Sequence, residues 1–140
     1  MRKWIALLAL AAMLGCVLAP HPGFTEDRDT VQLARCIYAL ARNESYETKL
    51  AIGTVVMNRM DNPWYADTLG GVLSAQHQFP AGNRYDAESL SAAHDVLCGR
   101  RVLPASAIGY QSVNATERRA DPSIKTVGGY CFYAEEANTL

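Results

Sequence analysis

The chain has 140 residues, of which 49% are hydrophobic and 19% are charged, and its formal net charge is -1 at pH 7. This balance is typical of one globular domain and excludes a disordered chain, which would combine low hydrophobicity with high net charge. Without a basic excess, a phosphate-binding glycine loop or a dinucleotide-binding glycine motif, we expect neither nucleic acids nor nucleotides as partners.

The N-terminal nineteen residues have the layout of a secretory signal peptide. Arg2 and Lys3 precede an uncharged apolar run over 4–19, which ends in the small residue Ala19. We expect cleavage after Ala19 and a protein exported to the periplasm, the cell envelope or the exterior. An uncleaved membrane anchor is one alternative, although the run is short for a span of about 20 residues. Lipidation at Cys16 is another.

The next stretch, 20–29, is polar and contains Pro and Gly, which predicts a flexible leader before a domain over 30–140. Helical spacing of apolar residues then predicts a first helix, capped by Asp29 or Thr30 and interrupted over 42–44. Its apolar face carries Leu33, Ile37, Leu40 and Ala41.

Capping residues predict three further helices. Ser45 begins a second helix, which Asp61-Asn62-Pro63 ends because proline cannot continue a helix. Thr68 begins a short helix through Ala75, and a loop follows over 77–85. Asp86 begins the third main helix, with Gly99 at its C-terminal end.

The C-terminal third changes character and predicts strands. Aromatic and β-branched residues over 108–113 and 126–133 indicate two strands, joined by a polar connection over 117–123. Helices followed by such a pair predict an α+β domain that is mainly helical, with a C-terminal antiparallel strand pair.

Three cysteines, Cys36, Cys98 and Cys131, remain after cleavage at Ala19. An odd number cannot pair completely within one chain, and we expect a Cys98–Cys131 disulfide or, alternatively, three small buried thiols. No Cys-x-x-Cys pair is present, and the histidines lack ligand spacing, so we expect no metal and no cofactor.

Five segments in order resemble the spore-cortex-lytic (SleB-type) cell-wall hydrolase family. Residues 33–47 and 51–59 resemble its helix pair, which reads approximately Tyr-Ala-Glu-Ala-Arg-Gly-Glu-x-Tyr-Glu and later Val-Asn-Arg. The other matching segments are 76–79, 92–99 and 127–133, so the resemblance covers roughly residues 31 to 133. It implies a small lytic-transglycosylase-like domain that acts on the glycan strands of peptidoglycan. We expect the protein to be a monomer.

The resemblance also implies that a glutamic acid protonates the leaving oxygen and then accepts a proton from the 6-hydroxyl of the sugar. The matching position in this chain is Leu40, which cannot transfer a proton, and Tyr130 stands where the family often has His. Glu44 matches the family's second Glu and is the candidate catalytic residue. Its alternative role is structural, as a carboxylate near the N-terminus of the second helix.

Two functions therefore remain open: a hydrolase of the lytic transglycosylase class, or an inactive homologue that binds peptidoglycan without cutting it. Hydrogen-bonding and aromatic side chains of the later segments are candidates for binding acetamido sugars. For Arg59 we expect an internal carboxylate partner, and Glu47 is expected to interact with the dipole of the second helix. The candidate sugar-binding residues are Gln78, Tyr110, Gln111, Tyr130 and Tyr133.

Overall fold

The structure, a computed structural model, describes residues 27–115 and 123–134. The expected signal peptide, most of the expected leader and most of the polar connection over 117–123 lie outside these residues. The described helices are α2 (Arg28–Ala41), α3 (Tyr46–Met60), α4 (Leu69–Ser74) and α5 (Ala87–Leu97). The strands are β1 (Gly109–Ser112), β2 (Lys125–Val127) and β3 (Tyr130–Tyr133).

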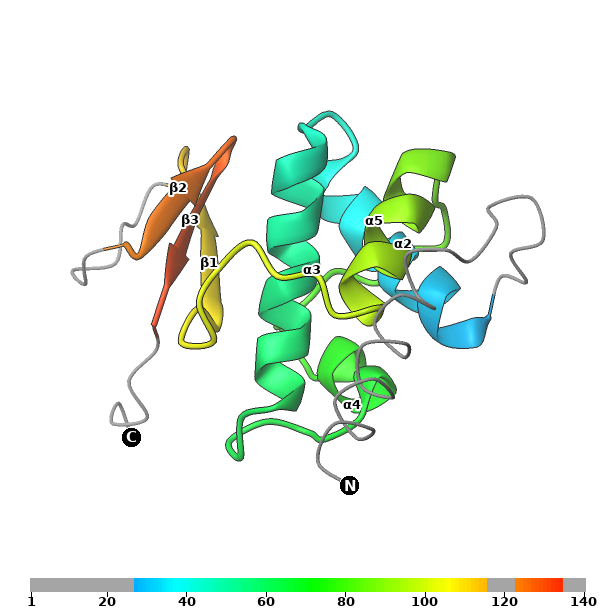
Figure 1. The fold of residues 1–140 in the computed structure, drawn as a ribbon, viewed down its shortest axis with the longest axis horizontal. Helices are drawn as coiled ribbons and strands as arrows, with labels where there is room; N and C mark the ends of the chain where they lie inside the picture. The colour runs from blue at the N-terminus through cyan, green and yellow to red at the C-terminus, as the bar shows by residue number, and fades with distance from the viewer. Residues whose placement is uncertain (1–26, 116–122, 135–140) are drawn as a thin grey trace, which may run out of the picture.

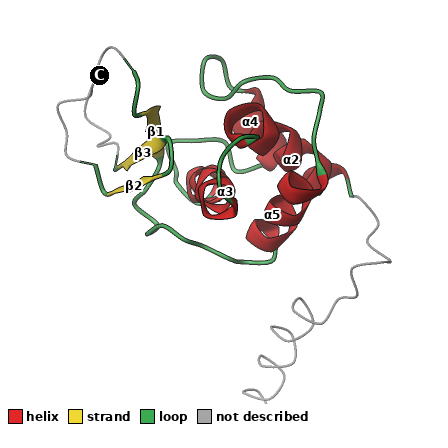
Figure 2. Ribbon diagram, turned by 90° about the horizontal axis from the view of Figure 1, so that it is seen from above, coloured by secondary structure: helices red, strands yellow, loops and turns green. Residues whose placement is uncertain are grey.

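Helix α3 lies at the centre of the molecule. The sheet lies on one side of it, and α2, α4 and α5 lie on the other (Figures 1 and 2). A helix enclosed in this way is buried around its circumference, and eleven of its fifteen residues are buried. Gly53 permits the close approach of α5, because a Cβ at this position would lie 2.9 Å from a methyl carbon of Val96.

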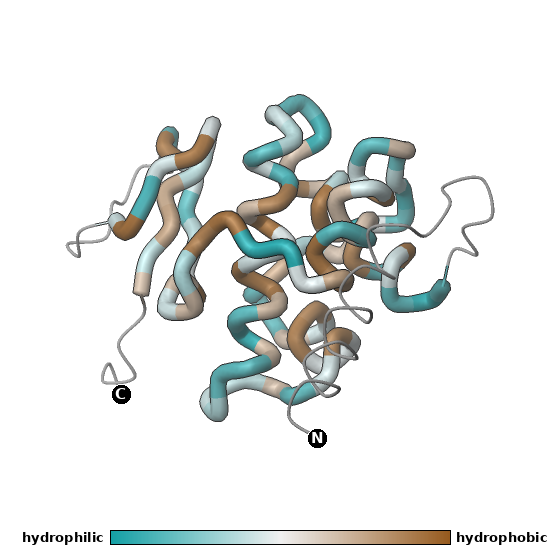
Figure 3. Tube along the Cα trace, in the orientation of Figure 1, coloured by the Kyte–Doolittle hydropathy of each residue, from teal (hydrophilic) through white to brown (hydrophobic). Residues whose placement is uncertain are grey.

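The core forms where the helices meet one another and the sheet. Leu33 and Ile37 of α2, Val55 of α3 and Phe132 of β3 are fully buried within it. In Figure 3 α4 is coloured mostly as hydrophobic, in keeping with the burial of Leu69 and Val72, whereas the turn between α2 and α3 is hydrophilic. The α+β class expected from the sequence is confirmed.

The N-terminal end of α2 differs from the prediction. The helix is capped by Asp27, whose carboxylate accepts a 2.7 Å hydrogen bond from the amide of Thr30. Asp29, one of the two expected caps, lies within the first turn instead, where the positive end of the helix dipole favours its charge. The predicted caps Ser45, Thr68 and Asp86 are confirmed.

The C-terminal sheet has three strands rather than two. All are antiparallel, in the order β1-β3-β2. The segment expected as one strand over 126–133 is divided, because Gly128 has a φ of 54° and turns the chain between β2 and β3. This turn is important for the site described below.

The expected Cys98–Cys131 disulfide is wrong, because Cys131 is a free thiol. Cys131 lies in β3, whereas Cys98 follows α5 on the opposite side of α3 (Figure 1). Cys36 is also a free thiol and is buried, which raises its pKa to about 12. For Cys36 the alternative of a small buried side chain is therefore confirmed.

Candidate functional site

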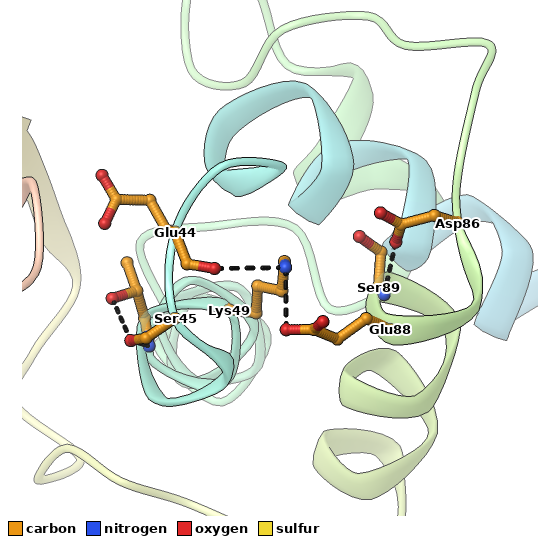
Figure 4. A network of polar contacts seen from close by, with 7 residues as sticks. Glu44, Ser45, Lys49, Asp86, Glu88 and Ser89 are labelled. Carbon is orange, nitrogen blue, oxygen red and sulfur yellow. Dashed lines mark hydrogen bonds and ion pairs between the residues drawn. The ribbon is translucent and has the colours of Figure 1, made fainter.

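Glu44 lies in the turn between α2 and α3. Helix α2 ends at Ala41, and the amide of Glu44 donates to the Ala41 carbonyl, so the chain leaves the helix before this residue. The half-buried carboxylate of Glu44 accepts a 3.2 Å hydrogen bond from the amide of Gly129. The carboxylate is therefore directed toward the β2–β3 turn, away from Lys49 (Figure 4).

The two glycines of this turn permit the approach of Glu44. A Cβ on Gly129 would collide with the Glu44 carboxylate, and a Cβ on Gly128 would collide with both that carboxylate and the Thr48 hydroxyl. Side chains larger than hydrogen would displace the carboxylate. The Gly128–Gly129 pair thus provides the turn and also the space that Glu44 occupies.

The main chain of Glu44 is anchored by a buried lysine. Lys49 is 2% exposed, and its ammonium group donates to the Glu44 carbonyl at 3.2 Å and to the Glu88 carboxylate at 2.9 Å (Figure 4). The contact with Glu88 links this turn to α5. Sequence reasoning missed Lys49, although a lysine followed by an apolar run in a predicted helix signals a buried cation with a specific partner.

The N-terminus of α3 is capped by Ser45 rather than by the carboxylate of Glu44. The Ser45 hydroxyl accepts from the amide of Thr48, as Asp86 accepts from the amide of Ser89 at the start of α5 (Figure 4). Ser45 takes the capping role. The hydrogen bond that the structure describes for the Glu44 carboxylate is instead with the amide of Gly129, far away in the sequence. Glu47, in the first turn of α3 as expected, lies 3.3 Å from the ammonium group of Lys125.

Leu40 contacts β3 through Tyr130, the residue that follows the Gly129 amide bound by Glu44. The Tyr130 hydroxyl donates a 2.6 Å hydrogen bond to the Leu40 carbonyl, and the partly buried Leu40 side chain packs on the core. Leu40 and Glu44 therefore contact the consecutive residues Tyr130 and Gly129. Burial, reinforced by the negative charge of Glu44, raises the pKa of Tyr130, so its hydroxyl stays protonated at neutral pH.

Aromatic rings continue from Tyr130 along the sheet. The ring centroids of Tyr130 and Tyr110 are 6.1 Å apart, and Tyr110 stacks on Phe79 at 5.3 Å. The Tyr110 hydroxyl donates to the carbonyl of Gln78 at 2.6 Å, and burial raises the pKa of Tyr110 to about 12. The structure thus brings together Tyr110, Tyr130 and Gln78, three of the expected sugar-binding residues.

Two of the expected sugar-binding residues lie on the other face of the sheet. In the β1–β3 pairing Gln111 is opposite Cys131, whereas Tyr110 is opposite Phe132. Because side chains alternate along a strand, Gln111 and Tyr133 project away from the Tyr110 and Tyr130 face. Tyr133 is also 6% exposed.

Arg59 ends the aromatic row and differs from its expected role. Its partners among the described residues are neutral oxygens rather than a carboxylate: the Ile108 carbonyl at 2.7 Å and the Gln78 side-chain oxygen at 2.8 Å. Its guanidinium carbon also lies 4.8 Å from the ring centroid of Phe79 and 4.9 Å from that of Tyr65. The side chain is almost fully buried and joins α3 to β1 and to the loop after α4.

We expect Arg59→Met to lower the free energy of unfolding by about 2–4 kcal/mol, because the substitution removes charge-assisted hydrogen bonds to Ile108 and Gln78 and leaves those oxygens without this donor. Urea unfolding followed by circular dichroism measures the change. Arg42→Met, at an exposed position on the α2–α3 turn, is the matched control and should change stability by no more than about 0.5 kcal/mol. Equal effects of the two substitutions would contradict a specific role for Arg59.

Within 27–115 and 123–134, no three His, Cys, Asp or Glu side chains are grouped as metal ligands would be. No helix in this part of the chain is long and apolar enough to cross a membrane. The site itself combines the Glu44 carboxylate at the Gly128–Gly129 turn with the row of aromatic side chains that begins at Tyr130.

The sequence matches one protein family over most of the described region. Residues 43–133 match the family described as cell wall hydrolase. The spore cortex-lytic enzyme of Bacillus subtilis (strain 168) is 34% identical over 73 residues, which are 52% of this chain and 24% of that protein. The spore cortex-lytic enzyme of Halalkalibacterium halodurans is 28% identical over 119 residues, which are 79% of this chain and 36% of that protein. The chain thus spans less than two thirds of the length of these relatives.

Two solved structures share the fold. The catalytic domain of the Bacillus cereus SleB protein matches with a TM-score of 0.68 and 22% identity, over 81% of this chain and 94% of that chain. The catalytic domain of the germination-specific lytic transglycosylase SleB of Bacillus anthracis matches with a TM-score of 0.69 and 24% identity, over 81% and 98%. The resemblance found in the sequence is confirmed: the chain belongs to the cell wall hydrolase family and has the fold of the SleB catalytic domains.

Proposed function

We propose that this chain is a peptidoglycan hydrolase of the lytic transglycosylase class, which cleaves the glycan strand with Glu44 as its acid and base. The observation that carries the proposal is the position of the Glu44 carboxylate. It is held by the Gly129 amide, and its charge acts on the Tyr130 hydroxyl, which donates to the main-chain carbonyl of Leu40, the position that matches the family's acid. Glu44 thus provides a carboxylate near the Tyr130 hydroxyl that contacts the main chain of position 40.

One carboxylic acid is sufficient for this reaction. The protonated Glu44 donates its proton to the glycosidic oxygen as the bond from that oxygen to C1 of N-acetylmuramic acid breaks. The resulting carboxylate accepts the proton of the sugar's 6-hydroxyl, whose oxygen then bonds to C1. The product is a 1,6-anhydro end, no water is consumed, and no carboxylate nucleophile is needed, in contrast to two-carboxylate glycosidases.

The second candidate function is binding of peptidoglycan without cleavage, and Leu40 is the observation that favours it. Its aliphatic side chain packs on the core and can neither donate nor accept a proton. Loss of a general acid typically lowers a rate by about 10²–10⁴. A chain that relied on that position alone would retain a surface for the glycan without the means to cut it.

The proposal places the protein outside the cytoplasm, where peptidoglycan lies. The positive charges of Arg2 and Lys3 and the apolar run over 4–19 support export through a signal peptide spanning 1–19. A leader over 20–29 would then precede the cell wall hydrolase domain. Asp27, the cap of α2, and the first residues of that helix fall within the expected leader. We propose that the domain acts as a monomer.

Incubation of the protein with purified sacculi, followed by mass spectrometry of the soluble fragments, tests the proposal. We expect muropeptides with 1,6-anhydro ends. Fragments with reducing ends would instead indicate hydrolysis by water. Retention on sacculi without soluble fragments would support the binding function, and neither retention nor fragments would contradict both.

A further inference from the structure

The aromatic row extends along the whole of α3. Gly129 meets Glu44 just before the N-terminal end of α3, whereas Ile108, before β1, meets Arg59 near its C-terminal end (Figure 1). Helix α3 has 15 residues and is therefore about 22 Å long. Tyr130, Tyr110 and Phe79 are partly exposed along this length, whereas Arg59 is almost fully buried, so the three rings are the part of the row that sugar rings can contact.

The row continues past Arg59 into the turn after α3. The Tyr65 ring lies on the Arg59 guanidinium, which also contacts Phe79. Trp64, next to Tyr65, is 70% exposed, the highest exposure of any large hydrophobic residue that the structure describes. A single exposed apolar side chain is common on protein surfaces, so the position of Trp64 beside Tyr65, rather than its exposure alone, directs attention to it.

Hydrogen bonds fix the main chain of the turn that carries Trp64, although the indole itself is exposed. The Asn62 side chain accepts a 2.9 Å hydrogen bond from the Trp64 amide, and the Asn62 carbonyl accepts one from the Tyr65 amide. A rigid aromatic side chain presented on a fixed turn binds a ligand with little loss of conformational entropy.

We propose that Trp64 is a distal binding platform for a sugar ring of the glycan strand, several rings away from Glu44. The proposal rests on the proposed function, since it assumes that a glycan strand lies along Glu44 and the partly exposed rings of Tyr130, Tyr110 and Phe79. The flat apolar face of a pyranose ring fits an exposed indole. The exposed carboxylates Asp61 and Asp67 flank the turn, which disfavours an anionic membrane surface as the occupant, whereas the N-acetylglucosamine rings of a glycan strand carry no charge.

The sequence provides a direct probe of this contact. The chain has two tryptophans, Trp4 and Trp64, and Trp4 lies in the expected signal peptide, so Trp64 is the single indole after cleavage and Trp4→Phe makes it so in the full chain. The ligands are peptide-free oligosaccharides of alternating N-acetylglucosamine and N-acetylmuramic acid, two and eight sugars long. We expect the octasaccharide to shift the Trp64 emission and the disaccharide to leave it unchanged.

Affinity measurements with variants complete the test. We expect Trp64→Ala to weaken octasaccharide binding by about tenfold, the contribution of one aromatic contact, and to leave disaccharide binding unchanged. Trp64→Phe should retain most of the affinity. Ile124→Ala, at the other exposed large hydrophobic residue in the described part of the chain, is the matched control and should bind as the parent does.

Other outcomes would overturn the proposal in distinguishable ways. The parent could bind both oligosaccharides, and Trp64→Ala could leave both affinities unchanged or weaken them equally. Either result would reject the distal platform and leave the proposed function standing. Failure of the parent to bind either oligosaccharide would reject the proposed function and the platform with it. Loss of binding to phosphatidylglycerol vesicles in Trp64→Ala, with glycan binding unchanged, would assign Trp64 to a membrane contact.

Discussion

Glu44→Gln is expected to lower the rate of anhydro-muropeptide release from sacculi by about 10²–10⁴, the contribution of a general acid. Glutamine has nearly the same shape as glutamate, and its side-chain oxygen can still accept the hydrogen bond from Gly129. The substitution therefore removes the proton and preserves the turn. Chromatography of the soluble fragments with mass detection gives the initial rates of parent and variant.

Glu47→Gln is the matched control for this measurement. Glu47 lies three residues further along the chain, is exposed, and forms an ion pair with Lys125 on the surface. Surface pairs contribute little, so the control should release fragments at the parental rate. If Glu44→Gln also cut at the parental rate, the acid would have to be another residue. Retention of both variants on sacculi would show that the binding surface is intact.

Much of the helical framework was predictable because helix starts depend on local chemistry. Ser45, Thr68 and Asp86 each accept a hydrogen bond from the amide three residues later, which is an interaction encoded within four consecutive residues. The predicted start of α2 was wrong because several polar residues in a row can serve as a cap. Asp27 takes the role, and this adds two residues to the helix before the expected Thr30.

The sheet was less predictable, although its signal was present. The Gly128–Gly129 pair lies between β-branched and aromatic residues, a pattern typical of a hairpin turn. The prediction of one strand over 126–133 left out this turn and therefore the position of the Gly129 amide. That amide donates to Glu44 across 85 residues of sequence, so the direction of the carboxylate depended on a pairing that no local pattern encodes.

The partners of buried charged residues were the least predictable part of the site. Arg59 was expected to pair with a carboxylate, yet Ile108, just before β1, and the loop after α4 present it with carbonyl and amide oxygens. Lys49 follows the same principle, because its carboxylate partner, Glu88, is 39 residues away on α5. A buried charge signals that a partner exists, whereas only the tertiary fold decides which partner it is.

Leu40→Glu is expected to raise the rate of anhydro-muropeptide release by less than the full contribution of a general acid, about 10²–10⁴, because Glu44 already provides one carboxylic acid. The substitution would place a second carboxylate in the same region as Glu44, since the Tyr130 hydroxyl contacts the main chain of residue 40 and is also subject to the charge of Glu44. Two carboxylates that share a site raise the pKa of one of them, which keeps a proton available at neutral pH. The same fragment analysis measures the gain.

Leu40→Gln is the matched control, because glutamine has the size and polarity of the new side chain without its proton. A gain in Leu40→Glu that Leu40→Gln lacks would show that the scaffold is intact and that the acid alone limits the parent. The Leu40→Glu/Glu44→Gln double variant then separates the two carboxylates. Without the charge of Glu44 the pKa of the introduced acid should fall, so the loss of activity on the alkaline side should move to lower pH. An unchanged rate in a folded Leu40→Glu variant would mean that position 40 does not face the scissile bond, and Glu44 would remain the candidate acid.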